Sequence, residues 1–164
     1  MRTLPVVLAL VCFDAGASAS LCGPAEAIVF SCVVAPSRKT LSLCASQNLE
    51  KDRGYLAYRF GAPGRIELEF PRRGTPSSAK QFRYAHYFRS QVDRTEVSFS
   101  AGEYSYTLFS YSDAEANPEK SEGVRVLRGQ VKSELLCSGQ SSADFTKLDA
   151  AVPCDEGNAL AMCR

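Results

Sequence analysis

The sequence has few of the residues on which enzyme active sites are usually built. It contains no tryptophan and a single histidine, His86, among 164 residues. Because Ser-His-Asp and Cys-His catalysis both need a histidine as proton shuttle, any such mechanism here depends on His86. No serine lies in a G-x-S-x-G motif. We therefore expect a protein that is not an enzyme.

Metal, nucleic-acid and membrane functions also lack their usual sequence features. There is no Cys-x-x-Cys pair, and one histidine is too few for a typical zinc site, so we expect neither a metal nor another cofactor. A net charge of +1 argues against a nucleic-acid-binding protein. Beyond residue 19 no run is apolar over the roughly 20 residues that a membrane-spanning helix needs, so we expect no membrane span.

The N-terminus has the pattern of a signal peptide. Arg2 is followed by an apolar run over residues 4–13 and by the small residues Ala17-Ser18-Ala19. The alternative is a buried N-terminal strand. We expect residues 1–19 to be removed on export to the periplasm or the outside, which leaves residues 20–164 as one domain.

Cysteine usage supports an oxidising compartment. Of seven cysteines, Cys12 falls within the signal peptide, and the remaining six predict three disulfides. Six cysteines allow many connectivities. The pairings we expect are Cys32–Cys44 across a first hairpin, Cys137–Cys154 across a C-terminal loop, and Cys22–Cys163 between the chain ends.

Short apolar or alternating runs predict a mainly β fold. The expected strands cover residues 27–32, 40–45, 55–60, 65–70, 81–89, 95–99, 103–111 and 123–127. Gly102 is expected to take the positive φ of a tight hairpin turn. Ser142 is a candidate cap for a short helix over residues 143–148. We expect a single antiparallel β-sandwich or small barrel with this short C-terminal helix, held by three disulfides.

The segment 80–94 is the first candidate binding surface, because basic and aromatic residues are interleaved along it. On one strand, Arg83, Tyr87 and Arg89 share a face, whereas Phe82, Tyr84, His86 and Phe88 share the other. Tyr and Arg are enriched at interface hot spots. We predict that Arg83, Tyr87 and Arg89 contact a partner. The alternative is a half-buried strand whose outer side is merely charged.

The second candidate is the turn at residues 98–104, with Ser100, Gly102, Glu103 and Tyr104 as candidate contacts. This Ser- and Gly-containing segment ending in tyrosine resembles bacterial periplasmic inhibitors of lysozyme. The resemblance implies a Ser-containing loop that inserts into the lysozyme cleft. Glu103 departs from that family, which tends to carry a basic residue before the tyrosine. A simple hairpin turn is the alternative.

A broader resemblance is to the small secreted and periplasmic proteins common in proteobacteria. The residues that carry it are Phe30-Ser31-Cys32, Leu43-Cys44-Ala45 and Tyr58-Arg59-Phe60-Gly61. The resemblance implies a Gram-negative periplasmic setting, and it implies no particular activity.

Together these features predict an exported, monomeric binding module for a protein or an envelope component. The first alternative is an inhibitor of lysozyme or another hydrolase. The second is a small hydrolase that uses His86 or the Glu67/Glu69 pair, since paired carboxylates perform acid–base work in glycosidases. The third is a structural envelope protein. A catalytic His86 or Glu67 should lie in a concave pocket beside a second titratable group.

Overall fold

A computed structural model describes residues 19–73, 75 and 77–162. All but the last residue of the predicted signal peptide lie outside this part of the chain. In the part that is described, no helix is long and apolar enough to cross a membrane.

The described chain forms one antiparallel sheet of nine strands in the order β4-β3-β2-β1-β9-β8-β7-β6-β5. The strands are β1 (Glu26–Val34), β2 (Lys39–Ser46), β3 (Leu56–Ala62), β4 (Arg65–Phe70), β5 (Arg83–Arg89), β6 (Val92–Ala101), β7 (Tyr104–Asp113), β8 (Lys120–Arg128) and β9 (Val131–Ala143). A 3₁₀ turn (Ser78–Gln81) precedes β5, and the short helix α1 (Leu148–Ala151) follows β9. The mainly β, antiparallel prediction is confirmed.

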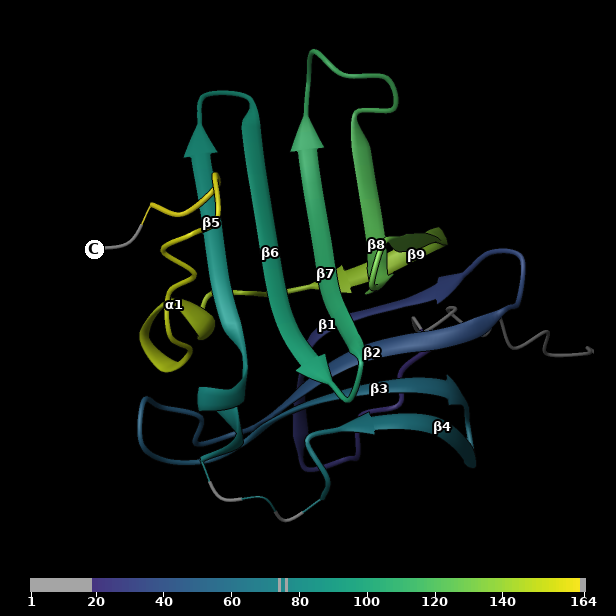
Figure 1. Ribbon diagram of the computed structural model, residues 1–164, viewed down its shortest axis with the longest axis vertical. Helices are drawn as coiled ribbons and strands as arrows, with labels where there is room; N and C mark the ends of the chain where they lie inside the picture. The colour runs from purple at the N-terminus through teal and green to yellow at the C-terminus, as the bar shows by residue number, and fades with distance from the viewer. Residues whose placement is uncertain (1–18, 74, 76, 163–164) are drawn as a thin grey trace, which may run out of the picture.

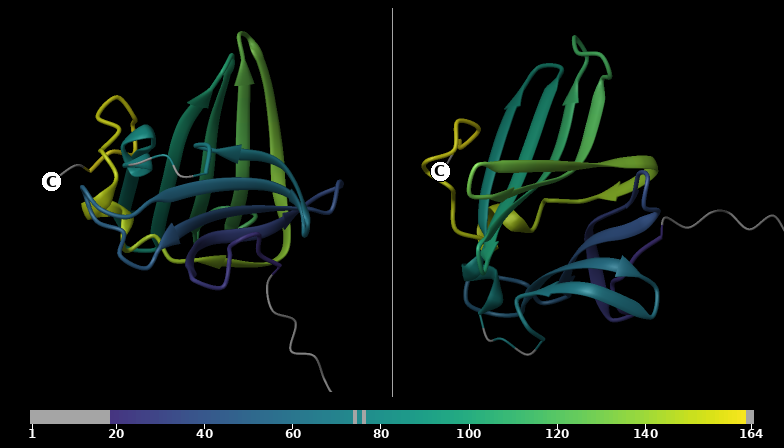
Figure 2. Two further views of the ribbon diagram at one scale, coloured as in Figure 1. Left: turned by 90° about the horizontal axis from the view of Figure 1, so that it is seen from below. Right: turned by 45° about the vertical axis from the view of Figure 1, so that its right-hand side comes forward.

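The sheet is curled into a half-barrel with two arms. Strands β5–β8 run upright in Figure 1, while β1–β4 cross below them. Strand β9 belongs to both arms, because residues 131–136 pair with β8 and residues 137–143 pair with β1. Figure 2 shows β9 passing between the arms from two other sides. The strands thus form one curled sheet, and a separate second sheet of a sandwich is not seen among the described residues.

The hydrophobic core fills the space between the two arms. Phe30 and Tyr58 enter it from the β1–β4 arm, and Phe99 and Leu108 enter it from the β5–β8 arm. Phe82, directly before β5, also belongs to it. The Tyr58 and Phe99 rings lie 4.9 Å apart between their centroids. Burying one such side chain stabilises the fold by about 1.5–3 kcal/mol, so these contacts fix the two arms against each other.

The C-terminal segment covers the outer edge of β5. The Tyr84 amide donates to the Pro153 carbonyl at 2.9 Å, and the Asp155 amide donates to the Tyr84 carbonyl at 2.8 Å. Farther along, the Met162 amide donates to the His86 carbonyl at 3.2 Å. These bonds satisfy backbone groups that an open sheet edge would leave for another chain.

Local sequence signals predicted the hairpins better than the C-terminal region. Gly102 takes the expected positive φ, +60°, in the turn between β6 and β7. The predicted helix over 143–148 is wrong, because β9 continues to Ala143 and the helix begins only at Leu148. The polar run near Ser142 belongs to β9, whose backbone pairs with β1 there, and this pairing outweighs the capping signal.

The disulfide pairings differ from those predicted. Within the described residues the bridges are Cys22–Cys44 and Cys32–Cys137. In the β1–β2 register Cys32 lies opposite Leu41, three residues from Cys44. Three residues along a strand span about 10 Å, which is too far for a bridge.

The other two predicted pairings are wrong because each uses a cysteine that is bonded to another partner. Cys137 bonds Cys32, which excludes the Cys137–Cys154 pair. Cys22 bonds Cys44, which excludes Cys22–Cys163, and residue 163 itself lies outside the described part of the chain.

Candidate functional site

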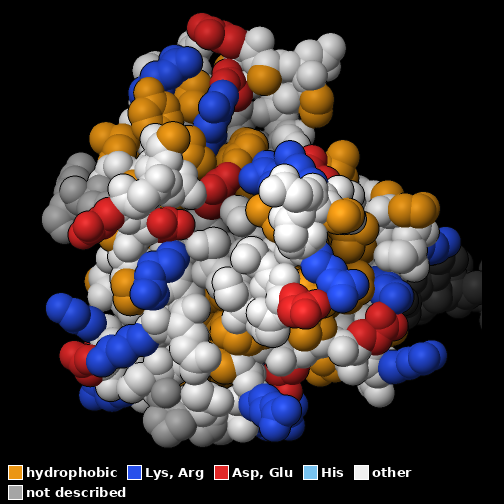
Figure 3. All heavy atoms as spheres, in the orientation of Figure 1, with side chains coloured by type: hydrophobic (Ala, Val, Ile, Leu, Met, Phe, Trp, Pro, Cys, Tyr) orange, Lys and Arg blue, Asp and Glu red, His pale blue; other side chains and the backbone are white. Residues whose placement is uncertain are grey.

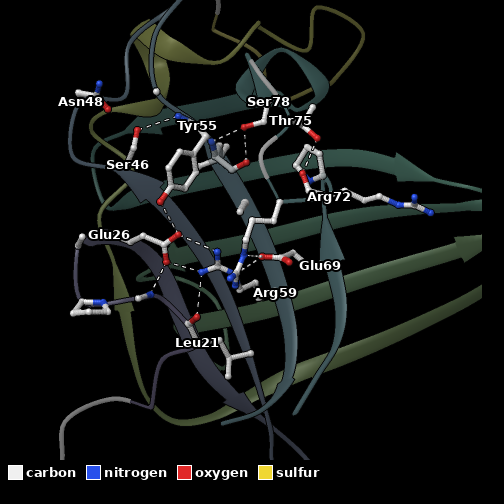
Figure 4. Close-up of a pocket in the computed structure, with 18 residues that line it drawn as sticks. Leu21, Glu26, Ser46, Asn48, Tyr55, Arg59, Glu69, Arg72, Thr75 and Ser78 are labelled. Atoms are coloured by element: carbon white, nitrogen blue, oxygen red, sulfur yellow. Dashed lines mark hydrogen bonds and ion pairs between the residues drawn. The ribbon is translucent and has the colours of Figure 1, made fainter. Parts of the chain in front are cut away.

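A cavity of about 790 Å³ lies beside β3, with the side chain of Arg59 in its wall. The Arg59 guanidinium donates to Glu26 through both terminal nitrogens, at 2.5 and 2.9 Å, and to Glu69 through Nε at 2.8 Å. It also donates to the Leu21 carbonyl at 3.2 Å. Figure 4 shows Arg59 between the two carboxylates, with Tyr55 above Glu26.

These charges are satisfied within the molecule. Burial by itself raises the pKa of Glu26, but hydrogen bonds from Arg59, the Gly23 amide and the Tyr55 hydroxyl outweigh it and hold that pKa below its usual value. The carboxylates in turn raise the pKa of Arg59. The ion pair therefore fastens residues 21–26 to the sheet, and its charged groups are already used by the chain itself.

A group of possible metal ligands lies next to this cavity. Cys22, Glu26 and Cys44 bring their ligand atoms within 4.8 Å of one another. The two sulfurs are joined in a disulfide, so neither is a thiolate ready to ligate a metal.

The inner face of the β5–β8 arm changes from apolar to polar along the strands. One row across the four strands is apolar and buried, and it belongs to the core: Tyr84, Val97, Leu108 and Val124. The next row in register is polar: His86, Thr95, Ser110 and Glu122. The row beyond is Phe88, Asp93, Ser112 and Lys120. The core thus ends before the arm does.

A hollow of about 680 Å³ lies where these polar rows meet the C-terminal segment. Strands β5 and β6 supply His86, Phe88 and Asp93, and the chain after β9 supplies Asp149 and Met162. We call it the His86 hollow. His86 Nε2 lies 3.0 Å from Asp93 Oδ1, with the two side chains 37% and 52% exposed. A histidine in a concave site beside a carboxylate is the arrangement that the hydrolase alternative requires.

Among the described residues that line the His86 hollow, the charged ones other than histidine are all acidic: Asp93, Asp144 and Asp149. Burial, followed by the charges of Asp149 and Asp93, raises the pKa of the Tyr84 hydroxyl to about 12. Both carboxylates therefore act on the same point at the floor of the hollow.

Two large apolar side chains also line the hollow without being buried. Phe88 is 62% exposed and Met162 is 54% exposed. The predicted strand face with Tyr84, His86 and Phe88 is the inner face of β5, and Phe88 lies on it past the end of the core. Exposed hydrophobic side chains at a concavity are a common feature of binding sites.

The predicted contacts Arg83, Tyr87 and Arg89 lie on the opposite, outer face of β5, away from the His86 hollow. In the view of Figure 3, basic and hydrophobic side chains alternate over the upper part of this arm. In the register of the sheet Arg94 lies between Tyr87 and Tyr111, and its guanidinium lies 5.9 Å from the centre of the Tyr111 ring. Arg94 is also paired with Asp113 at 2.7 Å, so part of this surface is neutralised internally.

The turn carrying Ser100, Gly102, Glu103 and Tyr104 is short. Ala101 pairs with Tyr104, so only two residues connect β6 to β7. Glu103 lies 3.0 Å from Arg128, and Arg128 lies 5.3 Å from the centre of the Tyr104 ring. The turn is therefore a tight hairpin, and Glu103 is held by its ion pair with Arg128 of β8.

The structure brings only some of the predicted contacts together. Arg83 and Ser100 line the same depression of about 420 Å³ near the lower end of the arm. Tyr87 and Arg89 do not line that depression, because they are four and six residues farther along β5.

The Glu67/Glu69 pair of the hydrolase alternative is occupied by cations. Glu67 lies 2.6 Å from Lys39, and Glu69 lies 2.8 Å from Arg59. Each carboxylate has its own partner, and that arrangement suits ion pairing better than a shared acid–base task.

Sequence reasoning missed Asp93, Asp149 and Met162 as site residues. A signal for Asp93 was present, because a tight turn at residues 90–91 places it opposite Phe88. Asp149 and Met162 come from distant segments, and only the docking of the C-terminal chain on β5 brings them in. No family model, curated protein or solved structure matches this chain, so the site is interpreted from its own geometry.

Proposed function

We propose that this chain is an exported binding module for a protein or an envelope component, and that the His86 hollow is its binding site. The protein acts as a monomer in the periplasm or outside the cell, without a cofactor. The Cys22–Cys44 and Cys32–Cys137 disulfides suit an oxidising extracellular environment.

The observation that carries the proposal is the end of the core part-way along the β5–β8 arm. Beyond the row that contains Val97 and Leu108, the inner face is polar although it faces a concavity. A strand that served only the fold would bury an apolar inner face along its length. A volume of about 680 Å³ falls in the range of small-ligand sites.

The test is a pull-down with the oxidised domain, residues 20–164, against periplasmic and envelope extracts. Ala143→Trp fills the hollow, because Ala143 is exposed and lines it. Ala150→Trp is the matched control, since Ala150 is exposed and lines a different depression. We expect capture of one partner by the wild type and by Ala150→Trp, and its loss with Ala143→Trp. Capture that survives Ala143→Trp but fails with Tyr87→Ala would move the site to the outer face.

The second candidate is a small hydrolase, favoured by the contact between His86 and Asp93. In such an enzyme Asp93 would orient the ring, and His86 would take a proton from the nucleophile. Within the described residues no serine or threonine hydroxyl is hydrogen-bonded to the ring, so water would serve as nucleophile. We expect His86→Ala to remain folded and to weaken partner capture without abolishing it, because the ring is one of several groups that line the hollow. Loss of a hydrolytic activity in folded His86→Ala, with partner capture retained, would instead support the hydrolase.

Inhibition of lysozyme rests on the turn 100–103 and has less support, because an inhibitor of that kind needs a projecting loop. The turn has two residues, and Glu103 is paired with Arg128. A lysozyme activity assay with the wild-type domain and Ser100→Ala tests this alternative directly.

A further inference from the structure

We propose that the His86 hollow binds a cationic ligand, in which an ammonium or guanidinium group lies next to an apolar group. This inference rests on the proposed function, since it names the chemistry of a ligand for the same site.

The cationic half of the ligand follows from two carboxylates that have no lysine or arginine partner among residues 19–73, 75 and 77–162. Asp93 is hydrogen-bonded to the His86 ring through Oδ1 and forms no ion pair with a described lysine or arginine, and its side chain is 52% exposed. Asp149 is exposed at the start of α1, and its carboxylate forms no ion pair within the described part of the chain. Elsewhere in the molecule carboxylates such as Glu69 and Asp113 are paired with arginines at 2.7–2.8 Å.

The third carboxylate of the hollow has a structural task and is not counted. Asp144 accepts hydrogen bonds from the Thr146 hydroxyl at 2.6 Å and the Thr146 amide at 3.1 Å. These bonds and the charge of Lys147 hold the pKa of Asp144 below its usual value. The inner-face cation Lys120 is likewise engaged, at 3.2 Å from Glu122. Asp93 and Asp149 remain to attract a cation.

The apolar half of the ligand follows from the exposed side chains that flank these carboxylates. Phe88 follows two residues after His86 on the same face of β5, and Met162 is held beside this strand by its bond to the His86 carbonyl. An aromatic face attracts cations as well as apolar groups, and a methionine adapts to the shape of its partner. An arginine or lysine side chain, or an aromatic amine, offers both parts.

The experiment follows ¹H–¹⁵N spectra of the domain 20–164 during titration with matched probes. The probes are acetyl-Leu-Arg-Leu-amide, the same peptide with neutral citrulline or with glutamate in place of arginine, and phenethylamine. One exposed carboxylate contributes about two- to fivefold in affinity. We expect the arginine peptide to bind at least about threefold more tightly than the citrulline peptide, with shifts at Phe88, Asp93 and Asp149.

Two pairs of variants test the two halves of the ligand. Asp149→Asn should lower the preference for arginine over citrulline by about two- to fivefold, whereas Glu115→Gln, outside the hollow, should leave it unchanged. Phe88→Ser should weaken the arginine and citrulline peptides alike. Its control is Val131→Ser, because Val131 is 67% exposed and does not line the hollow.

The outcomes separate this inference from the proposed function. The cationic class would be overturned if the arginine and citrulline peptides bound equally, or the glutamate peptide bound more tightly, with shifts in the hollow. The hollow would then remain the proposed binding site. Absence of hollow shifts with every probe, together with partner capture that survives Ala143→Trp, would overturn both. Phenethylamine bound as tightly as the arginine peptide supports the class and identifies a small amine as its source. Weaker binding of phenethylamine identifies a basic protein segment.

Discussion

The Arg59 ion pair gives a prediction about stability that the structure makes quantitative. In the pair with Glu26 the two side chains are only 6% and 7% exposed. Arg59→Met removes the cation and leaves the Glu26 carboxylate buried. Removing one partner of a buried pair typically costs about 3–5 kcal/mol. Glu26 keeps the bonds from the Gly23 amide and the Tyr55 hydroxyl, so we expect the lower end, about 3 kcal/mol.

The assay is urea unfolding of the oxidised domain at neutral pH, followed by circular dichroism. The control is Arg53→Met, whose pair with Glu50 has both side chains 62% exposed and should contribute less than about 1 kcal/mol. The double variant Arg59→Met/Glu26→Gln should recover part of the loss, because it removes the uncompensated charge. A cost for Arg59→Met no larger than that for Arg53→Met, or a double variant less stable than the single, would refute the reasoning.

Three further perturbations test the fold. Removing the Cys32–Cys137 bridge should cost more stability than removing the Cys22–Cys44 bridge, because they close separations of 105 and 22 residues. The chain-entropy model gives losses of about 4.8 and about 3.4 kcal/mol, and urea unfolding of the two paired Cys→Ala variants measures them. Gly123→Ala should lower the melting temperature, since its Cβ would lie 2.2 Å from a backbone oxygen of β9. The pKa of Glu26 is lower in the folded than in the unfolded protein. The ionised carboxylate therefore contributes its full stabilisation above about pH 4.5 and loses it as the pH falls through the folded-state pKa. Glu26→Gln should flatten this part of the curve of unfolding free energy against pH.

The hairpins could be predicted because residues close together in the sequence specify their strands and turns. The alternation of Ile66, Leu68 and Phe70 and the turn ending in Gly64 specify the β3–β4 hairpin within a few residues. Strand β9 could not be predicted in this way. It contains Lys132, Ser133 and several later polar residues, and it is a strand because β8 and β1 pair with its two halves.

Disulfide connectivity depends on the same nonlocal information. The order β2-β1-β9 places Cys32 beside Cys137, although the two are 105 residues apart. The spacing of the cysteines does not reveal that strand order. The register of the β1–β2 hairpin, with Cys32 opposite Leu41, excludes the pairing of Cys32 with Cys44.

The candidate site was predictable only in part. Period-two alternation separated Arg83, Tyr87 and Arg89 from His86 and Phe88, and the structure places the two sets on opposite faces of β5. The alternation did not show where the core ends along the inner face. That limit depends on how far β9 and the C-terminal segment extend across the arm, and therefore on the tertiary fold.

The most direct test of the account is photo-cross-linking of the exported protein with a photoreactive amino acid at position 143, 150 or 87. Position 143 lines the His86 hollow, position 150 lines a different depression, and position 87 lies on the outer face of β5. The account predicts one discrete adduct from position 143 and none from position 150 or 87. An adduct from position 87 or 150, with none from position 143, would contradict a binding site in the hollow.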